Sequence, residues 1–176
     1  MWGDFIKDWH NSSFDISGRD NLEETDNIWE KVYEAVIKEK EKCRSNYVAK
    51  DTLLYRVHRE HENIKMPLRE DFSDDEAYKS EKKYVEHLNS KPNIEFDNHW
   101  VSFTKGVDVI KSPYFESKGL RGEVIVIKAD KAVDIAEEIQ YYCGGRVHDE
   151  KEVVAPLNKA TLVEVLNYPD FIKKYK

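Results

Sequence analysis

The period of the hydrophobic pattern changes along the chain, and this change is the strongest constraint on its fold. Residues 22–46 carry apolar side chains at helical spacing, which predicts a long amphipathic helix with a charged outer face. A capping pattern at Ser73 predicts a second helix that runs to about Leu88. Short β-compatible runs, concentrated in the second half, predict strands at 53–57, 99–104, 122–127, 152–155 and 161–166. Helices therefore lead and strands follow, so we expect an α+β fold whose sheet need not be parallel.

The remaining segments complete a single domain of 176 residues. Residues 1–20 mix Trp, Ser, Gly and Asp without a clear period, and we interpret them as a loosely held arm. A short helix is expected at 107–111, closed by Pro113, and another after Pro169. Residues 131–142 look helical or irregular. The sequence thus predicts an arm, a helical part at 22–46 and a core at 53–167.

Composition and missing motifs argue against several classes of function. The net charge is −7, so the chain lacks the diffuse basic field of a nonspecific nucleic-acid binder, and nucleic acid is not expected as a partner. There is no GxGxxG or GxxxxGK[ST] loop for phosphate binding and no GxSxG elbow of a serine hydrolase. No signal-peptide pattern and no apolar run of about 18 residues occurs, which predicts a cytoplasmic protein without a membrane partner.

Three short segments, each on or beside a predicted strand, carry the chemistry. They are Leu-Tyr-Arg-Val-His at 54–58, Trp-Val-Ser-Phe-Thr at 100–104 and Asp-Glu-Lys-Glu-Val-Val at 149–154. Each is common by itself, and the information lies in the ordered set and its strand context.

In order and character, these segments resemble the arginine, serine and glutamate signatures of the cholera-toxin-like mono-ADP-ribosyltransferases, over about residues 53–156. The resemblance implies a split β core of two small packed sheets with N-terminal helices, and NAD bound in the cleft between the sheets. It implies transfer of ADP-ribose from NAD to an arginine of a target protein, with release of nicotinamide and without a metal. The sequence departs from the family pattern at Phe103, which replaces the middle Thr of the Ser-Thr-Ser motif.

The two acids fit this chemistry. Loss of nicotinamide passes through a transition state with oxocarbenium character, which a carboxylate stabilises. The resemblance assigns this catalytic role to Glu152. On a regular strand Glu150 shares a face with Glu152, and the resemblance implies that it orients and helps to deprotonate the acceptor guanidinium. A guanidinium is protonated near neutral pH and is a poor nucleophile, so it needs such help.

The other expected site residues bind NAD or order the acids. The resemblance implies that Arg56 binds the NAD pyrophosphate or adjoining ribose, and that Ser102 hydrogen-bonds Glu152. Thr104 shares a face with Ser102 on an alternating strand, while Phe103 points into the other layer. His58 shares the face of Arg56 and is a further candidate for NAD contact.

Aromatic residues are candidates for contacts with the substrates. A ring should stack on nicotinamide, and the candidates are Tyr114, Phe115 and Trp100. The family keeps a substrate-recognition loop before its acidic motif, where this chain has Tyr141 and Tyr142 followed by the glycines 144–145. The alternative for these two tyrosines is a packing role.

Other functions stay open. An NAD glycohydrolase on the same fold would use water as the acceptor. A non-catalytic binding module would keep the fold without the activity, and the departure from the motif at Phe103 supports this alternative. The cluster His-Arg-Glu-His-Glu at 58–62 suggests a metal-dependent nuclease or hydrolase, but no third ligand is obvious, so no metal is expected. The biological settings compatible with the sequence are a phage protein, a delivered bacterial effector, or a toxin whose partner is an antitoxin or inhibitor.

Overall fold

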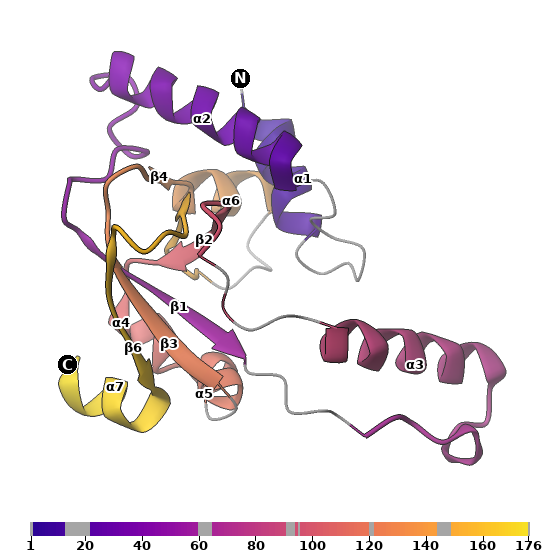
Figure 1. Cartoon of the computed structure of the whole chain (residues 1–176). Helices are drawn as coiled ribbons and strands as arrows, with labels where there is room; N and C mark the ends of the chain where they lie inside the picture. Colours follow the sequence, from indigo (N-terminus) through magenta and orange to yellow (C-terminus); the bar gives the residue numbers. More distant parts are fainter. Residues whose placement is uncertain are drawn as a thin grey trace.

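The computed structural model describes residues 2–12, 22–59, 65–90, 94, 96–119, 122–143 and 149–175. Its helices are α1 (Gly3–Ser12), α2 (Leu22–Lys38), η1 (Arg69–Asp71, a 3-10 helix), α3 (Asp75–Ser90), α4 (Val107–Ile110), α5 (Pro113–Gly119), α6 (Ala136–Cys143) and α7 (Tyr168–Lys174) (Figure 1). Its strands are β1 (Leu53–Arg59), β2 (Trp100–Thr104), β3 (Gly122–Lys128), β4 (Val133–Asp134), β5 (Glu152–Pro156) and β6 (Leu162–Asn167). The predicted α+β class and the five predicted strands are confirmed, and β4 is an additional strand in a segment expected to be helical or irregular.

The strands form one antiparallel sheet in the order β4-β5-β2-β1-β3-β6. The backbones of its two halves, β4-β5-β2 and β1-β3-β6, are paired at a single described position, where Tyr55 lies opposite Thr104. In contrast, β1 pairs with β3 along its whole length, from Leu53 with Lys128 to Arg59 with Gly122. In place of the two small packed sheets that the resemblance implies, the structure has one hydrogen-bonded sheet, whose halves are joined by a single residue pair.

Apolar side chains on one face connect the two halves into a shared core, which we call the inner cluster. It contains Leu54 and Ile125 from one half and Phe103 and Val153 from the other, all at most 3% exposed. Its other members lie on the strands or on connecting segments, and no helical residue belongs to it within the described residues. Since no helix covers this face, the halves must curve toward each other to exclude water from it.

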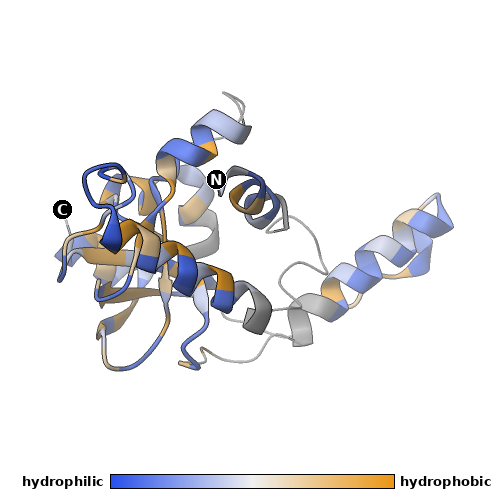
Figure 2. Ribbon diagram, turned by 90° about the horizontal axis from the view of Figure 1, so that it is seen from above, coloured by the Kyte–Doolittle hydropathy of each residue, from blue (hydrophilic) through white to orange (hydrophobic). Residues whose placement is uncertain are grey.

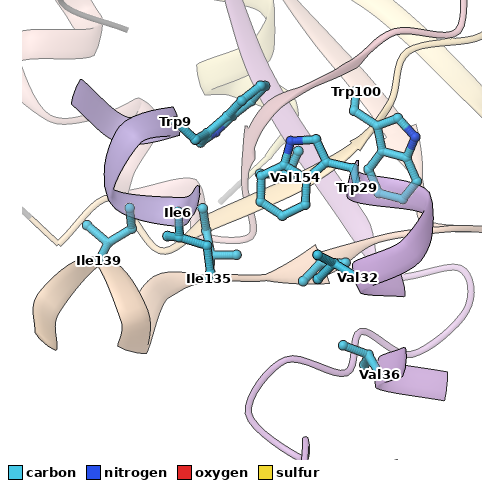
Figure 3. Packing of buried hydrophobic residues seen from close by; sticks show 10 residues of the cluster. Ile6, Trp9, Trp29, Val32, Val36, Trp100, Ile135, Ile139 and Val154 are labelled. Carbon is cyan, nitrogen blue, oxygen red and sulfur yellow. The ribbon is translucent and has the colours of Figure 1, made fainter. Parts of the chain in front are cut away.

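The opposite face of β4-β5-β2 is covered by α1, α2 and α6, as Figure 3 shows. Trp29, Val32 and Val36 project from α2 and are buried, which confirms the predicted apolar stripe. Ile6 and Trp9 of α1 are 1% and 3% exposed, and Trp9 packs edge-to-face on Trp29 at 5.2 Å. The prediction of a loose arm is wrong for residues 3–12, because these spaced apolar side chains fold as a helix onto the core; residues 13–20 lie outside the described part.

Helix α2 ends at Lys38, so its predicted continuation to residue 46 is wrong. Residues 39–46 form turns instead, with Asn46 N–H donating to the Cys43 carbonyl at 3.0 Å. The turns return the chain to the sheet, where Asn46 is 5% exposed and Tyr47 bridges to Val133. Contacts with the sheet therefore outweigh helix propensity in this charged segment.

The opposite face of β1-β3-β6 is covered by α4, α5 and α7. Apolar side chains of α4 and α7 form a further buried cluster with this face. In it, the rings of Tyr55 and Phe171 meet edge-to-face, with their centroids 5.4 Å apart. The predicted helix near 107–111 and the predicted C-terminal helix are confirmed, the latter capped by the Asn167 side chain. Pro113 does more than close α4: it is the first residue of α5, a position where its missing N–H costs little.

Helix α3, predicted from its capping pattern, lies between β1 and β2 in the chain and stands away from the sheet (Figures 1 and 2). Asp74 accepts the Glu76 N–H at 2.9 Å at its start. Figure 2 shows that α3 is mainly hydrophilic, in contrast to the strands of the sheet. Among the described residues, no helix has the length and apolar character needed to cross a membrane.

Replacement of Trp9 tests whether α1 is an integral part of the core. Because Trp9 is 3% exposed, we expect Trp9→Ala to lower the free energy of unfolding by about 3–5 kcal/mol. Lys7→Ala, at an exposed position of the same helix, should change it by less than about 0.5 kcal/mol. Urea denaturation of both variants measures the difference, and equal stabilities would mean that α1 does not pack as described.

Candidate active site

The ladder between β2 and β5 brings Ser102 and Glu152 together. Thr104 pairs with Glu152 and Ser102 with Val154, so Ser102 and Glu152 lie on one face as diagonal neighbours. Ser102 Oγ donates a hydrogen bond to Glu152 Oε1, the contact that the family resemblance leads us to expect. Glu152 is 7% exposed, so this bond partly compensates for the removal of its carboxylate from water.

Arg56 spans the point where β1 and β2 separate. The pairing of Tyr55 with Thr104 would place Val57 opposite Ser102 if the ladder continued, but the two strands separate there. Arg56 Nη1 instead donates to the Ser102 carbonyl at 2.9 Å. The three residues predicted from the sequence, Arg56, Ser102 and Glu152, are therefore linked by consecutive hydrogen bonds.

Glu150 and Glu152 are not on one regular strand, which corrects the sequence prediction. Strand β5 begins at Glu152, and Lys151 has a φ of 47°, in the left-handed region that interrupts strand alternation. Both acids nevertheless line one small pocket, because the turn at Lys151 redirects the chain between them. The expected proximity of the acids is present, but it arises from a turn.

Helices α1 and α6 supply the other walls of this pocket, which we call the acidic pocket. Its remaining lining residues are His10, Ala136, Ile139, Gln140, Asp149 and Lys151. His10 is 8% exposed, and its Nδ1 lies 4.0 Å from Glu152 Oε2, on the oxygen that Ser102 does not contact. His10 was not predicted from the sequence, although the recurring apolar residues around it are typical of a helix.

Asp134 anchors the start of α6 beside the acidic pocket. It is 6% exposed; its Oδ1 accepts the Ala136 N–H at 3.0 Å, and its Oδ2 is bonded by Lys105. Asn46 donates to the Asp134 carbonyl at 2.9 Å and also bonds Glu138. The chain segment that follows β2 is thus tied to the helix that carries Gln140.

The other positions of the second motif serve the fold. Thr104 is 4% exposed, and its Oγ1 accepts the Gly106 N–H at 3.0 Å, so it caps the turn into α4. It does not line the acidic pocket. Phe103 points into the inner cluster, as predicted. Trp100 is 1% exposed and stacks on Trp29 at 6.3 Å, so the prediction that it stacks on nicotinamide is wrong for this arrangement.

The remaining candidates are not brought into the acidic pocket. His58 lies two residues beyond Arg56 on β1, opposite Glu123. Tyr114 and Phe115 are on α5, which packs against β1; their rings meet at 5.1 Å and Tyr114 is 49% exposed. These residues therefore lie on or beside β1, the strand that carries Arg56.

Tyr141 and Tyr142 are on helix α6 rather than on the expected loop. Tyr141 is 81% exposed, so its ring is accessible to solvent. Tyr142 packs on α1: a Cβ added to Gly3 would lie 2.2 Å from its ring, so a larger residue at position 3 would require the Tyr142 side chain to shift. The predicted recognition residues thus differ, with Tyr142 in a packing role; the glycines 144–145 lie outside the described residues.

A metal site was an alternative at residues 58–62. His61, Glu60 and Glu62 lie outside the described residues. In the part of the chain that the structure describes, no group of three or more His, Cys, Asp or Glu side chains is arranged to bind a metal ion.

Comparison of the chain with protein-family models, curated proteins and solved structures found no match. The case for a function therefore depends on the residues and their geometry.

Removal of the Asp134 carboxylate tests the anchoring of α6. We expect Asp134→Ala to lower the free energy of unfolding by about 2 kcal/mol, because it removes the cap of α6 and leaves the Ala136 N–H without its acceptor. Lys105→Ala should cost no more than about 1 kcal/mol, since the Lys105 side chain is 43% exposed. Thermal or urea denaturation measures both, and a larger loss for Lys105→Ala would contradict the anchoring role.

Proposed function

We propose that the protein is an NAD-dependent mono-ADP-ribosyltransferase that modifies an arginine of a target protein. The observation that carries the proposal is the chain of hydrogen bonds from Arg56 to the Ser102 backbone and from the Ser102 hydroxyl to Glu152. These residues come from the three segments that resemble the family signatures, and they lie on the neighbouring strands β1, β2 and β5. Chance similarity of three short motifs would not require these residues to be linked by hydrogen bonds.

Glu152 is the proposed catalytic carboxylate. Oε1 is occupied by Ser102, which leaves Oε2 as the oxygen for the ribose hydroxyls of NAD and for the developing positive charge. The bond between ribose C1′ and the nicotinamide nitrogen breaks, and nicotinamide leaves with the electron pair. Glu152 is buried, so little water screens its carboxylate. It therefore interacts with this charge more strongly than an exposed carboxylate would.

Glu150 is the proposed residue that orients the acceptor arginine. It lines the acidic pocket with Glu152, so an arginine bound to Glu150 would lie close to the reacting carbon. A guanidinium nitrogen forms the new bond to C1′ and loses a proton, which Glu150 accepts or passes to solvent. The acidic lining suits a cationic acceptor better than a neutral one.

The sheet geometry also agrees with the proposal. The near-separation of the sheet into two halves fits the split β core that the resemblance implies, and Arg56 lies at the joint between them. An arginine there can bind a phosphate of NAD bidentately. The acidic pocket is small as described, so NAD must displace side chains at its mouth, and His10 on α1 borders the path to Oε2.

Replacement of Glu152 tests the proposal directly. Glu152→Gln keeps the size and the contact with Ser102 but removes the charge, so we expect nicotinamide release and ADP-ribose transfer to fall by at least about 100-fold. Incubation with labelled NAD and a cell extract measures both, and mass spectrometry of labelled bands identifies the modified residue. Glu34→Gln, at an exposed position of α2, is the matched control and should keep wild-type activity. Wild-type activity in Glu152→Gln would overturn the assignment.

Replacement of Glu150 separates the transferase from an NAD glycohydrolase. We expect Glu150→Ala to lower arginine modification by about tenfold or more while nicotinamide release changes much less, because only the transfer uses a bound guanidinium. Parallel assays of nicotinamide and of ADP-ribosylated arginine give the ratio. Nicotinamide release without any modified protein, in the wild type and in Glu150→Ala alike, would instead establish the glycohydrolase.

A non-catalytic binding module would give neither product. Calorimetric titration with NAD distinguishes this case, since the proposed enzyme binds NAD and a module that has lost the site does not. For the transferase, the labelled bands identify the target protein, which is the partner that the proposal requires. An inhibitor or antitoxin would be a second protein partner and would suppress labelling.

A further inference from the structure

Lys151, between the two acids, adopts a backbone conformation that residues with a side chain rarely take. Its φ of 47° lies in the left-handed region, where the Cβ atom crowds the backbone. Such a conformation persists where surrounding contacts hold it, and it is common at functional sites.

The backbone of Lys151 is fixed on both sides. Its N–H donates to Asp149 Oδ1 at 3.0 Å, and its carbonyl accepts the Lys105 N–H at 3.3 Å. The second bond ties the turn to the residue that directly follows β2, the strand of Ser102.

The side chain of Lys151 is held as well. Nζ lies 3.1 Å from both carboxylate oxygens of Asp108, on α4. This contact also lowers the pKa of the Asp108 carboxyl, chiefly through the hydrogen bond from Lys151. The stem crosses Gly106, where an added Cβ would lie 2.8 Å from Lys151 Cδ and 2.7 Å from Asp108 Oδ1. Gly106 thus leaves the space that the ion pair needs.

We infer that Lys151 and Asp108 are positioning residues that set the location of Glu150 relative to Glu152. If Lys151 were extended, Glu150 and Glu152 would follow strand alternation; the left-handed turn instead gives them the relation seen in the acidic pocket. Glu152 is fixed by β5 and Ser102, whereas Glu150 precedes the strand and directly adjoins the turn. The ion pair of Lys151 with Asp108, which we call the clamp, therefore controls the choice between arginine and water as the acceptor. This inference rests on the proposed function.

Asp108→Asn tests the clamp because it removes the ion pair without a change of size. We expect the ratio of arginine modification to nicotinamide release to fall by about tenfold, since a displacement of about 1 Å in a positioned group has effects of this order or larger. Nicotinamide release itself should stay within about twofold of the wild type, because Glu152 is held by other contacts. Lys151→Ala should lower the same ratio. Lys151→Arg keeps the positive charge and should therefore retain most of the wild-type ratio.

Asp75→Asn is the matched control. It removes exposed ion pairs on helix α3 away from the acidic pocket, Asp75 with Lys79 at 3.0 Å and with Arg69 at 3.2 Å, and should leave the ratio unchanged. A wild-type ratio in both Asp108→Asn and Lys151→Ala, or a parallel fall of both activities, would overturn the inference alone. Absence of nicotinamide release by the wild-type protein would overturn the proposed function, and the inference with it.

Discussion

Packing between the two halves of the sheet is the constraint on which the rest of the structure depends. A single residue pair, Tyr55 with Thr104, joins the halves by backbone pairing, so side chains must supply most of the cohesion. The inner cluster does this with Leu54, Ile125, Phe103 and Val153. Burial of such side chains contributes about 1.5–3 kcal/mol each, far more than one pair of the ladder. The curvature that this packing imposes leaves β1 and β2 separated beyond their joint, where Arg56 reaches Ser102.

The candidate site follows from this arrangement. Ser102 and Glu152 lie on the face of β2 and β5 that α1 and α6 cover, so the carboxylate is buried next to a hydroxyl donor and beside His10. Burial of a charge is costly unless hydrogen bonds compensate for it, so a buried charge is weak evidence for a stabilising role, and specificity or chemistry is another use for it. The reaction proposed above would be a use of this kind for the Glu152 charge.

The sequence could predict those parts of the site that share local order. Ser102 and Thr104 alternate on a strand with Phe103 between them, and the structure agrees, because strand alternation is a property of neighbouring residues. The relation of Glu150 to Glu152 could not be obtained in this way. It depends on the left-handed conformation of Lys151, which is held by Asp108 and Lys105, residues distant in the sequence. His10 was missed for the same reason, since only packing of α1 on the core brings it to Glu152.

The sequence by itself determined the α+β class, the five main strands, the apolar stripe of α2 and the C-terminal helix, because period and capping are encoded over a few neighbouring residues. Tertiary structure decided where α2 ends, since the contacts of Asn46 and Tyr47 with the sheet replace its last turns. It also decided that residues 3–12 form a packed helix, and that six strands join in one sheet through one pair. Each of these outcomes depends on burial of apolar surface between distant segments, and no local pattern specifies which segments will meet.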